Sequence, residues 1–305
     1  MIKKTDLKNN INLNWKISEK KLKEYKYGLC KFIIDKSYEL NLSKKIAALA
    51  MQIVNYFFIK NCYFNYDKLT VICAALTLAI KFKTSDKTNL NKIINFYISY
   101  KKEENGIDKF LSKIEIFNFK NQILDLEIKI MKLFDNSLPD SFPFEYIYLY
   151  SKILYPNNDQ EMYNMGCKIC MDSYFTYANN IYQNYVVALT CIYISAKFLD
   201  IKTILDHNFL NIDKMKYILE NNMDENKFIN NCNKILDDPT ELLINEKEKN
   251  FEKNKDSYFK SLTLDKKLHP LLKMDDLLEC IEIISDFYEE IKANYDIMNR
   301  DKKDY

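Results

Sequence analysis

The sequence predicts an all-α fold, and three observations support this prediction. The chain of 305 residues contains only 3 Gly and 5 Pro. Strand-rich folds need many turns, so this scarcity favours long helices. Apolar residues recur with helical spacing through most of the chain. Hydrophobic residues make up 48% of the sequence and charged residues 29%, so a filled core and a solvated surface are both available.

Five helices are expected in the first half of the chain. Residues 43–58 place their apolar side chains on one broad stripe, and Asn41 or Ser43 can cap the start of this helix. Residues 66–82 are apolar nearly all round and include small alanines, so this helix should lie at the centre of its neighbours. The other expected helices cover residues 22–40, 89–100 and 116–134.

A break in the pattern divides the chain. Residues 138–144 (LPDSFPF) contain two of the five prolines, which favours a linker. Helical periodicity then resumes and continues until Pro239. The expected helices in this part cover residues 145–154, 160–178, 182–199, 212–220 and 224–236. A highly charged segment and a last amphipathic helix near residues 275–298 follow.

The predicted architecture is therefore two tandem five-helix domains with flanking N- and C-terminal helices. The predicted limits are 1–19 for an N-terminal extension, 20–138 for the first domain, 139–238 for the second, 239–272 for a charged linker and 273–305 for the C-terminal helix and tail.

Charge and hydrophobicity exclude several kinds of partner. The formal net charge is +2, whereas nucleic-acid binders usually carry a basic excess, so no direct nucleic-acid partner is expected. The longest largely apolar stretch, residues 185–196, is too short for a bilayer, which needs about 20 residues, so no membrane partner is expected. Residues 1–14 lack the apolar run of a signal peptide. The eight cysteines are therefore expected to be free, mostly buried thiols of a soluble intracellular protein.

The sequence contains no recognisable catalytic constellation. The three glycines lie far apart, so a glycine-rich phosphate loop cannot form. His207 and His269 have no partner at metal-ligand spacing, and Cys167 and Cys170 lie inside an expected helix without a second pair. We therefore expect two core-facing thiols, no catalytic residue, no cofactor and no metal site, and the chain is not expected to be an enzyme.

Two motifs in the first half of the chain are distinctive. In residues 71–86 (VICAALTLAIKFKTSD), an Ala-rich helix ends in Lys followed by an apolar residue, and this motif resembles the third helix of a cyclin box. Residues 123–133 (ILDLEIKIMKL) resemble the fifth helix with its single Glu. Residues 25–40 resemble the first helix of transcription-type cyclins, and 143–154 and 185–197 resemble parts of a second box. The resemblance covers about residues 15–238 and implies two tandem five-helix cyclin boxes.

The resemblance also implies a kinase-binding site. It places the Lys and Glu of the family at Lys81 and Glu127, which in cyclins bond to the kinase backbone near its mobile αC helix. Phe82 and Met131 beside them would supply an apolar anchor. Spacing alone also allows an intramolecular or solvated charge pair. The sequence departs from the family at Lys83–Thr84, where acidic residues are common, and at Asn136, where an aromatic is common.

The resemblance favours the transcription group of cyclins (classes C, H, K, L and T). The Met-Arg-x-Ile-Leu docking motif of cell-cycle cyclins is absent, and Arg300 is the only arginine, so no Arg-x-x-Leu destruction box exists. The implied function is activation of a cyclin-dependent protein kinase that phosphorylates the C-terminal domain of RNA polymerase II. The implied location is the nucleus, with the cytoplasm as a further possibility, and a third assembly subunit is a further implied partner.

Two alternatives remain open at this stage. A TFIIB-like transcription factor also carries two cyclin-type folds and would bind DNA in a salt-sensitive manner. A cyclin-fold scaffold would bind no kinase. The C-terminal helix has two interpretations as well: it packs back on its own boxes, or it presents Phe287 and Tyr288 to an additional partner.

Overall fold

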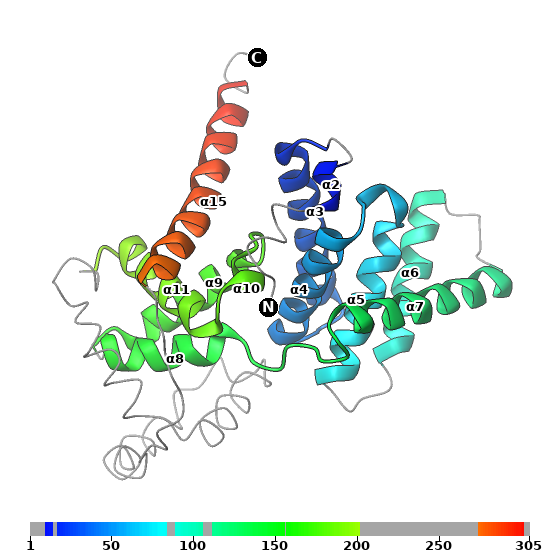
Figure 1. Ribbon diagram of the computed structural model, residues 1–305, viewed down its shortest axis with the longest axis horizontal. Helices are drawn as coiled ribbons and strands as arrows, with labels where there is room; N and C mark the ends of the chain where they lie inside the picture. Colours follow the sequence, from blue (N-terminus) through cyan, green and yellow to red (C-terminus); the bar gives the residue numbers. More distant parts are fainter. Residues whose placement is uncertain are drawn as a thin grey trace, which may run out of the picture. The chain divides into compact units, whose positions relative to one another are not determined.

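The structure is a computed structural model that describes residues 10–14, 17–83, 89–105, 112–155, 157–201 and 274–301. All regular elements within these residues are helices, which confirms the predicted all-α fold (Figure 1). The chain divides into two compact units, which comprise Met1–Asp140 with Ser173–Ile181, and Ser141–Asp172 with Tyr182–Tyr305. The predicted helices at 212–220 and 224–236, the predicted linker at 239–272 and both histidines lie outside the described residues.

The five long helices of the first unit, α3 to α7, correspond to the five predicted in the first half of the chain, and three short helices were not predicted there. In chain order, the helices of this unit are α2 (Ile11–Asn14), α3 (Glu19–Glu39), α4 (Lys44–Lys60), the 3-10 helix η1 (Tyr63–Asn65), α5 (Lys68–Lys83), α6 (Asn89–Asn105), α7 (Lys113–Leu133) and the short α10 (Ala178–Ile181). The cap of α4 is Ser43, whose hydroxyl accepts a hydrogen bond from the backbone N–H of Ile46 at 3.4 Å. Asn41 instead adopts a left-handed conformation, φ 52°, just after α3.

Helix α5 lies at the centre of the first unit, as the sequence predicts. Every side chain from Leu69 to Ile80 is buried, and α5 packs against α3, α4, α6 and α7 (Figure 1). Ala74, Ala75 and Ala79 are fully buried, and their small side chains allow the neighbouring helices to approach closely. A helix that is apolar all round must be covered on every side.

The segment after α9 (Asp159–Ser173) turns where the sequence pattern predicts a continuous helix to residue 178. The hydroxyl of Thr176 donates to the carbonyl oxygen of Ser173 at 2.7 Å and accepts from the backbone N–H of Ala178 at 3.0 Å. Threonine side chains can replace helical backbone bonds in this way. The two bonds end α9, form a turn and start α10.

This turn supplies part of the first unit's core. The side-chain amide of Asn55 on α4 donates to the carbonyl oxygen of Tyr174 at 2.9 Å, and both groups are buried. The Cys30 thiol on α3 lies 3.5 Å from the same carbonyl oxygen. Burial raises the pKa of Cys30 to about 12, so this thiol stays protonated and can donate. Residues far along the chain therefore complete the unit that α3 and α4 begin.

The described part of the second unit is built around one apolar helix. Its helices are α8 (Pro143–Leu154), α9, α11 (Asn184–Phe198) and α15 (Met274–Asp301). Pro143 stands in the first turn of α8, where the missing N–H costs no helical bond. Helix α11 is buried at Ala188, Ser195 and Ala196, the small residues that the sequence singles out. Among the described helices, none is both long and apolar enough to cross a membrane.

The C-terminal helix α15 packs back on α11 within its own unit (Figure 1). Leu277, Cys280 and Ile284 form its buried side. The hydroxyl of Tyr182 donates to a carboxylate oxygen of Glu279 at 2.9 Å. The first of the two interpretations of this helix is therefore the observed one.

Candidate partner-binding site

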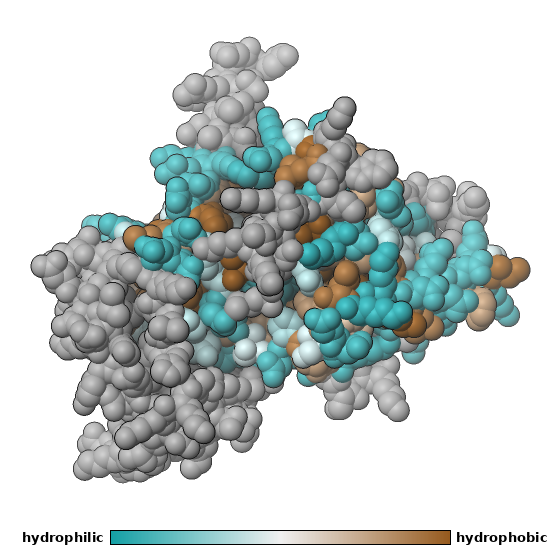
Figure 2. All heavy atoms as spheres, in the orientation of Figure 1, coloured by the Kyte–Doolittle hydropathy of each residue, from teal (hydrophilic) through white to brown (hydrophobic). Residues whose placement is uncertain are grey.

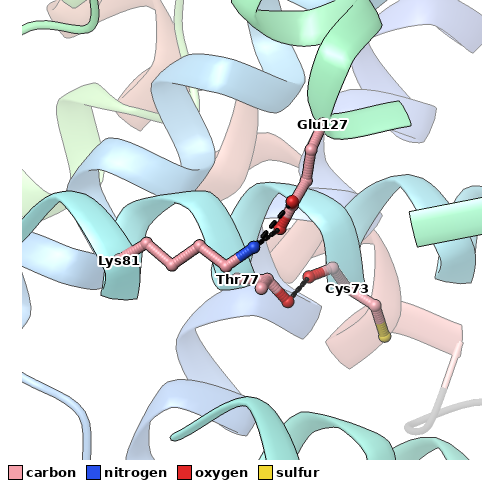
Figure 3. Close-up of polar contacts among 4 residues, drawn as sticks. All are labelled: Cys73, Thr77, Lys81 and Glu127. Carbon is pink, nitrogen blue, oxygen red and sulfur yellow. Dashed lines mark hydrogen bonds and ion pairs between the residues drawn. The ribbon is translucent and has the colours of Figure 1, made fainter. Parts of the chain in front are cut away.

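The C-terminal end of α5 places Lys81 at the edge of the first unit. Cys73, Thr77 and Lys81 are four residues apart and so lie along one side of the helix. The Thr77 hydroxyl donates to the Cys73 carbonyl oxygen at 2.7 Å, so it is satisfied within its own helix (Figure 3). One turn later, the Lys81 side chain leaves the core and reaches water.

Helix α7 brings Glu127 to the same place. Glu127 lies on the buried side of α7 together with Phe119, Ile123 and Ile130. The Lys81 ammonium lies 2.9 and 2.7 Å from the two carboxylate oxygens of Glu127 (Figure 3). The Lys81 side chain is 48% exposed and that of Glu127 only 9%. The structure thus brings the two principal predicted residues together as an intramolecular ion pair.

This ion pair retains bonding capacity. An ammonium group has three donors, and a carboxylate has about four lone-pair sites. The two bonds between Lys81 and Glu127 leave one donor and further acceptor positions unused by the pair. A second polypeptide that covered the pair could supply a backbone carbonyl to Lys81 and a backbone N–H to Glu127. Such a contact would add to the ion pair and would not need to break it.

The two predicted apolar neighbours lie beside the pair in sequence. Phe82 follows Lys81 directly and is exposed, and the Lys83 ammonium lies 5.1 Å from the centre of its ring. Met131 lies one turn after Glu127 on α7 and is partly buried. Lys83, which stands where cyclins commonly have an acidic residue, donates to the carbonyl oxygen of Asp140 at 2.7 Å. Its ammonium is therefore used within the first unit.

The sequence interpretation missed an exposed apolar stripe on α7. Its first four members are residues of α7 with large apolar side chains that are 48–72% exposed, namely Ile114, Phe117, Leu124 and Ile128. Their spacing of three, seven and four residues keeps them on one side of the helix, and Met131 continues the series. Hydrophobic side chains reach the surface along α7 among hydrophilic ones (Figure 2). We call these five residues the α7 stripe.

The α7 stripe borders the ion pair. Glu127 is three residues after Leu124, one before Ile128 and four before Met131, so it lies along the edge of the stripe. Four of the five members, all except Ile114, lie within the expected helix at residues 116–134, so most of the spacing was visible in the sequence. A helix that buries one stripe on its own core and exposes a second one has two apolar sides, and the second is typical of a partner contact.

The end of α7 explains a departure from the cyclin pattern. Asp135 and Asn136 have φ values of 49° and 60°, in the left-handed region that Asn and Asp tolerate better than most residues. The backbone N–H of Asn136 donates to the Met131 carbonyl oxygen at 2.8 Å, a bond typical of a Schellman helix end. The aromatic residue expected at this position would be strained in such a backbone, so the change to Asn follows from the turn.

The other sequence candidates carry no site in the described residues. Cys167 and Cys170 are buried thiols, as predicted. Burial raises the pKa of Cys170 well above its ordinary value, which keeps the thiol protonated and unreactive. Within the part of the chain that the structure describes, no cluster of His, Cys, Asp or Glu could hold a metal ion.

Comparisons with known proteins place this geometry on a known fold. No family model matches the sequence, and no curated protein matches it. One matching solved structure is a chain of the yeast RNA Pol II CTD kinase CTDK-1 complex, with a TM-score of 0.56 and 16% identity over 93% of this chain and 89% of that chain. Another is a chain of the Chaetomium thermophilum CAK complex bound to ATP-gamma-S, with a TM-score of 0.45 and 12% identity over 88% and 74%.

The likeness to the CTDK-1 chain extends over nearly the full length of both chains. At 16% identity, this likeness shows that the two chains share a fold. The described part of the motif at residues 71–86, which ends at residue 83, lies on α5, and the motif at residues 123–133 lies on α7; these are the third and fifth long helices of the first unit, the order that the resemblance predicts. The chain therefore has the cyclin fold that its sequence motifs predict.

Proposed function

We propose that this chain is a regulatory cyclin subunit that binds and activates a cyclin-dependent protein kinase and has no active site of its own. The observation that carries this proposal is the α7 stripe beside the Lys81–Glu127 ion pair. Apolar residues that stay exposed next to a nearly buried carboxylate form a surface suited to a protein partner. Phe82 at the end of α5 extends the apolar part of this surface.

The dimensions of the α7 stripe fit a helix of the kinase. The stripe runs from residue 114 to residue 131, or about 25 Å at 1.5 Å per residue. A partner helix laid along α7 could bury its own apolar side against the stripe. The kinase αC helix is the proposed partner element, because its position decides whether the catalytic Lys–Glu pair of a kinase can form.

Activation would follow from differential binding. A kinase samples states with αC swung in or out, and a subunit that binds only the inward state shifts the population toward activity. Lys81 and Glu127 would contribute bonds to the kinase backbone that exist only in that state. If they are desolvated in the complex, the loss of either residue would weaken binding by about 2–5 kcal/mol.

The transcription role is the more specific part of the proposal. It is supported by the sequence resemblance to transcription-type cyclins and by the fold shared with a chain of an RNA Pol II CTD kinase complex. On this proposal the kinase acts on the C-terminal domain of RNA polymerase II, and the chain works in the nucleus. A third assembly subunit would complete the complex.

The test is a pull-down from an extract of the source cells with the full chain as bait. Bound kinase is identified by mass spectrometry and assayed on a peptide of the polymerase C-terminal domain. The variants Lys81→Ala/Glu127→Ala and Leu124→Asp/Ile128→Asp should each retain less than about one tenth of the kinase, which corresponds to a loss of about 1.4 kcal/mol or more. The control is Tyr38→Asp, because Tyr38 is a highly exposed aromatic residue on α3.

Three results would contradict parts of the proposal. If the wild-type chain retains no kinase, the cyclin function is wrong and the scaffold alternative replaces it. If both double variants retain as much kinase as Tyr38→Asp does, the site is wrong although the function stands. If the bound kinase ignores the polymerase peptide but phosphorylates other substrates, the transcription role is wrong. Circular dichroism of each variant confirms that the helices are intact.

A further inference from the structure

The exposed side of α7 follows the heptad pattern of a coiled coil. In heptad letters, the a positions hold Ile114, Asn121 and Ile128, and the d positions hold Phe117, Leu124 and Met131. Five of these six residues form the α7 stripe, and the sixth, Asn121, is exposed in its middle. A seam of a and d positions fits a second helix whose own a and d side chains interdigitate with it.

This seam is open to a partner. It is separate from the side that α7 buries on its own unit, which includes Phe119 and Ile123. No side chain between Lys113 and Asn118 is buried, and this end of α7 extends beyond the neighbouring helices (Figure 1). A contiguous apolar surface of this kind is typical of an interaction site.

Asn121 favours a parallel partner helix with the same sequence. In a parallel pair, each a position faces the a position of the other helix, so Asn121 would face the Asn121 of a second copy and the two amides could hydrogen-bond. In an antiparallel pair, a positions face d positions, and each amide would be buried against apolar side chains without a partner. A single Asn at an a position is a known means of fixing the register of a coiled coil.

The charges beside the seam are self-complementary in the parallel arrangement. Lys120 stands just before an a position and Asp125 just after a d position, which makes them g and e residues, and both are exposed. In a parallel pair, a g residue lies beside the next e residue of the other helix, so Lys120 would meet the Asp125 of a second copy. Two-fold symmetry forms this contact twice. An antiparallel pair would instead bring like charges together.

The remaining edge positions do not oppose the parallel pair. Lys113, the first g residue, would lie beside the neutral Asn118 of the second copy. Glu127, the third g residue, would lie beside Lys132, and its carboxylate keeps acceptor positions beyond its two bonds with Lys81. Along residues 113–132, no g residue would therefore face an e residue of the same charge.

We propose that two copies of this chain pair through the α7 stripe as a parallel two-stranded coiled coil. The seam spans about two and a half heptads, so the interface is small and a dissociation constant of roughly 10–100 µM is expected. The pair covers the α7 stripe, so a helix of another protein cannot dock there at the same time. Dimer and kinase complex therefore exclude each other, a consequence that alone rests on the proposed function.

The test is sedimentation velocity of the full-length chain from about 1 to about 300 µM, a range that brackets the expected dissociation constant. The wild-type chain should change from monomer to dimer across this range. Lys120→Asp and Asp125→Lys each bring like charges together and should weaken the dimer about fivefold. The double variant Lys120→Asp/Asp125→Lys restores opposite charges and should restore the dimer, as should an equimolar mixture of the two single variants.

A further variant and matched controls complete this test. Asn121→Asp places two carboxylates at facing a positions and should weaken the dimer more than about tenfold. Lys31 and Asp35 are exposed on α3, so Lys31→Asp and Asp35→Lys make the same charge changes away from α7 and should leave the dimer unchanged. Circular dichroism confirms that the helices of each variant are intact.

Four results would overturn the pairing: a chain that stays monomeric over the whole range, a dimer that the α7 variants leave intact, one that the α3 controls weaken equally, or a double variant that fails to dimerise. The pull-down described above scores kinase binding separately. A dimeric chain that retains no kinase would leave the pairing standing and the cyclin function wrong. A monomeric chain that retains a kinase would give the reverse, and a kinase complex with two α7-paired copies would contradict the mutual exclusion.

Discussion

Lys81 and Glu127 form one ion pair, but their two ends differ sharply in their contact with water. The Lys81 side chain is about half exposed, whereas the Glu127 side chain is almost completely buried. Each residue therefore depends on the other to a different degree. Glu127 needs Lys81 to neutralise a charge that water hardly reaches, while Lys81 can be solvated without Glu127.

This asymmetry predicts unequal effects on stability. Lys81→Met leaves a nearly buried carboxylate without its partner and should lower the free energy of unfolding by about 1–3 kcal/mol. Glu127→Gln leaves a solvated ammonium and should cost less than about 1 kcal/mol. Urea unfolding measures both values, and Lys36→Met, which breaks the exposed pair of Lys36 with Glu39, is the control. Equal costs for the two Lys81–Glu127 variants would contradict this account of the pair.

Gly166 permits close packing of α9 on α8 and α11. A Cβ atom at this position would lie 2.8 Å from the Cγ2 atom of Ile147 and 3.4 Å from the Cδ1 atom of Ile192. Gly166→Ala should therefore lower the free energy of unfolding by about 1–3 kcal/mol through overpacking. Gly28 on α3 has no atom within 4 Å of such a Cβ, so Gly28→Ala should stabilise by about 0.5–1 kcal/mol. Thermal unfolding of the two variants should show shifts of opposite sign.

Asn55 joins α4 to the turn after α9. Its buried amide donates to the Tyr174 carbonyl oxygen, and its own oxygen lies 3.6 Å from the Cys30 sulfur. Asn55→Ala removes these contacts inside the core and should lower the free energy of unfolding by about 1–3 kcal/mol. Denaturant unfolding gives this value, with Asn121→Ala at an exposed position of α7 as the comparison. Similar losses for the two variants would mean that the turn contributes little to the first unit.

Asp172 predicts a pH dependence of stability. Burial raises the pKa of this carboxyl above its ordinary value of 3.8, and the hydrogen bond from Tyr288 offsets only part of the shift. The folded state therefore binds more protons than the unfolded state between the two pKa values, so the contribution of Asp172 to stability falls as pH rises through this window. The contribution is most favourable below pH 3.8, where both states are protonated.

Asp172→Asn keeps an acceptor for the Tyr288 hydroxyl and removes the charge. The free energy of unfolding of this variant should equal that of the wild type at acidic pH and exceed it at neutral pH. The free energy of unfolding of the wild type and of the variant is measured at several pH values between about 3.5 and 7, and the slopes of this free energy against pH are compared. Asp125→Asn, at an exposed position, is the control. A difference that is independent of pH would show that Asp172 does not titrate in this range.

The sequence predicted the central helix because the cause of its position is local. Residues 66–82 are apolar all round, and such a helix has one physical solution, which is to be covered on every side. The pairing of Lys81 with Glu127 was different. They are 46 positions apart, and no periodicity connects them, so only the resemblance to a cyclin box indicated that they act together.

Two features escaped sequence analysis for physical reasons. The α7 stripe was not recognised because periodicity shows that a helix has apolar positions but not which of them its own core covers. The turn at Thr176 was missed because Tyr174, Phe175 and Tyr177 keep the apolar pattern going past Ser173. The end of α9 depends on one hydroxyl group with two backbone partners, and a sequence pattern does not report such bonds.

The division of the chain has a consequence for its synthesis. The first unit includes Ser173–Ile181, so a ribosome that has released residues 1–140 has not yet supplied the Tyr174 carbonyl that Asn55 and Cys30 contact. Domains generally fold as they emerge, yet here the earlier unit must wait for part of the later sequence. A nascent chain paused before residue 181 would expose an incomplete core, and chaperones that recognise exposed apolar surface would find their target in that interval.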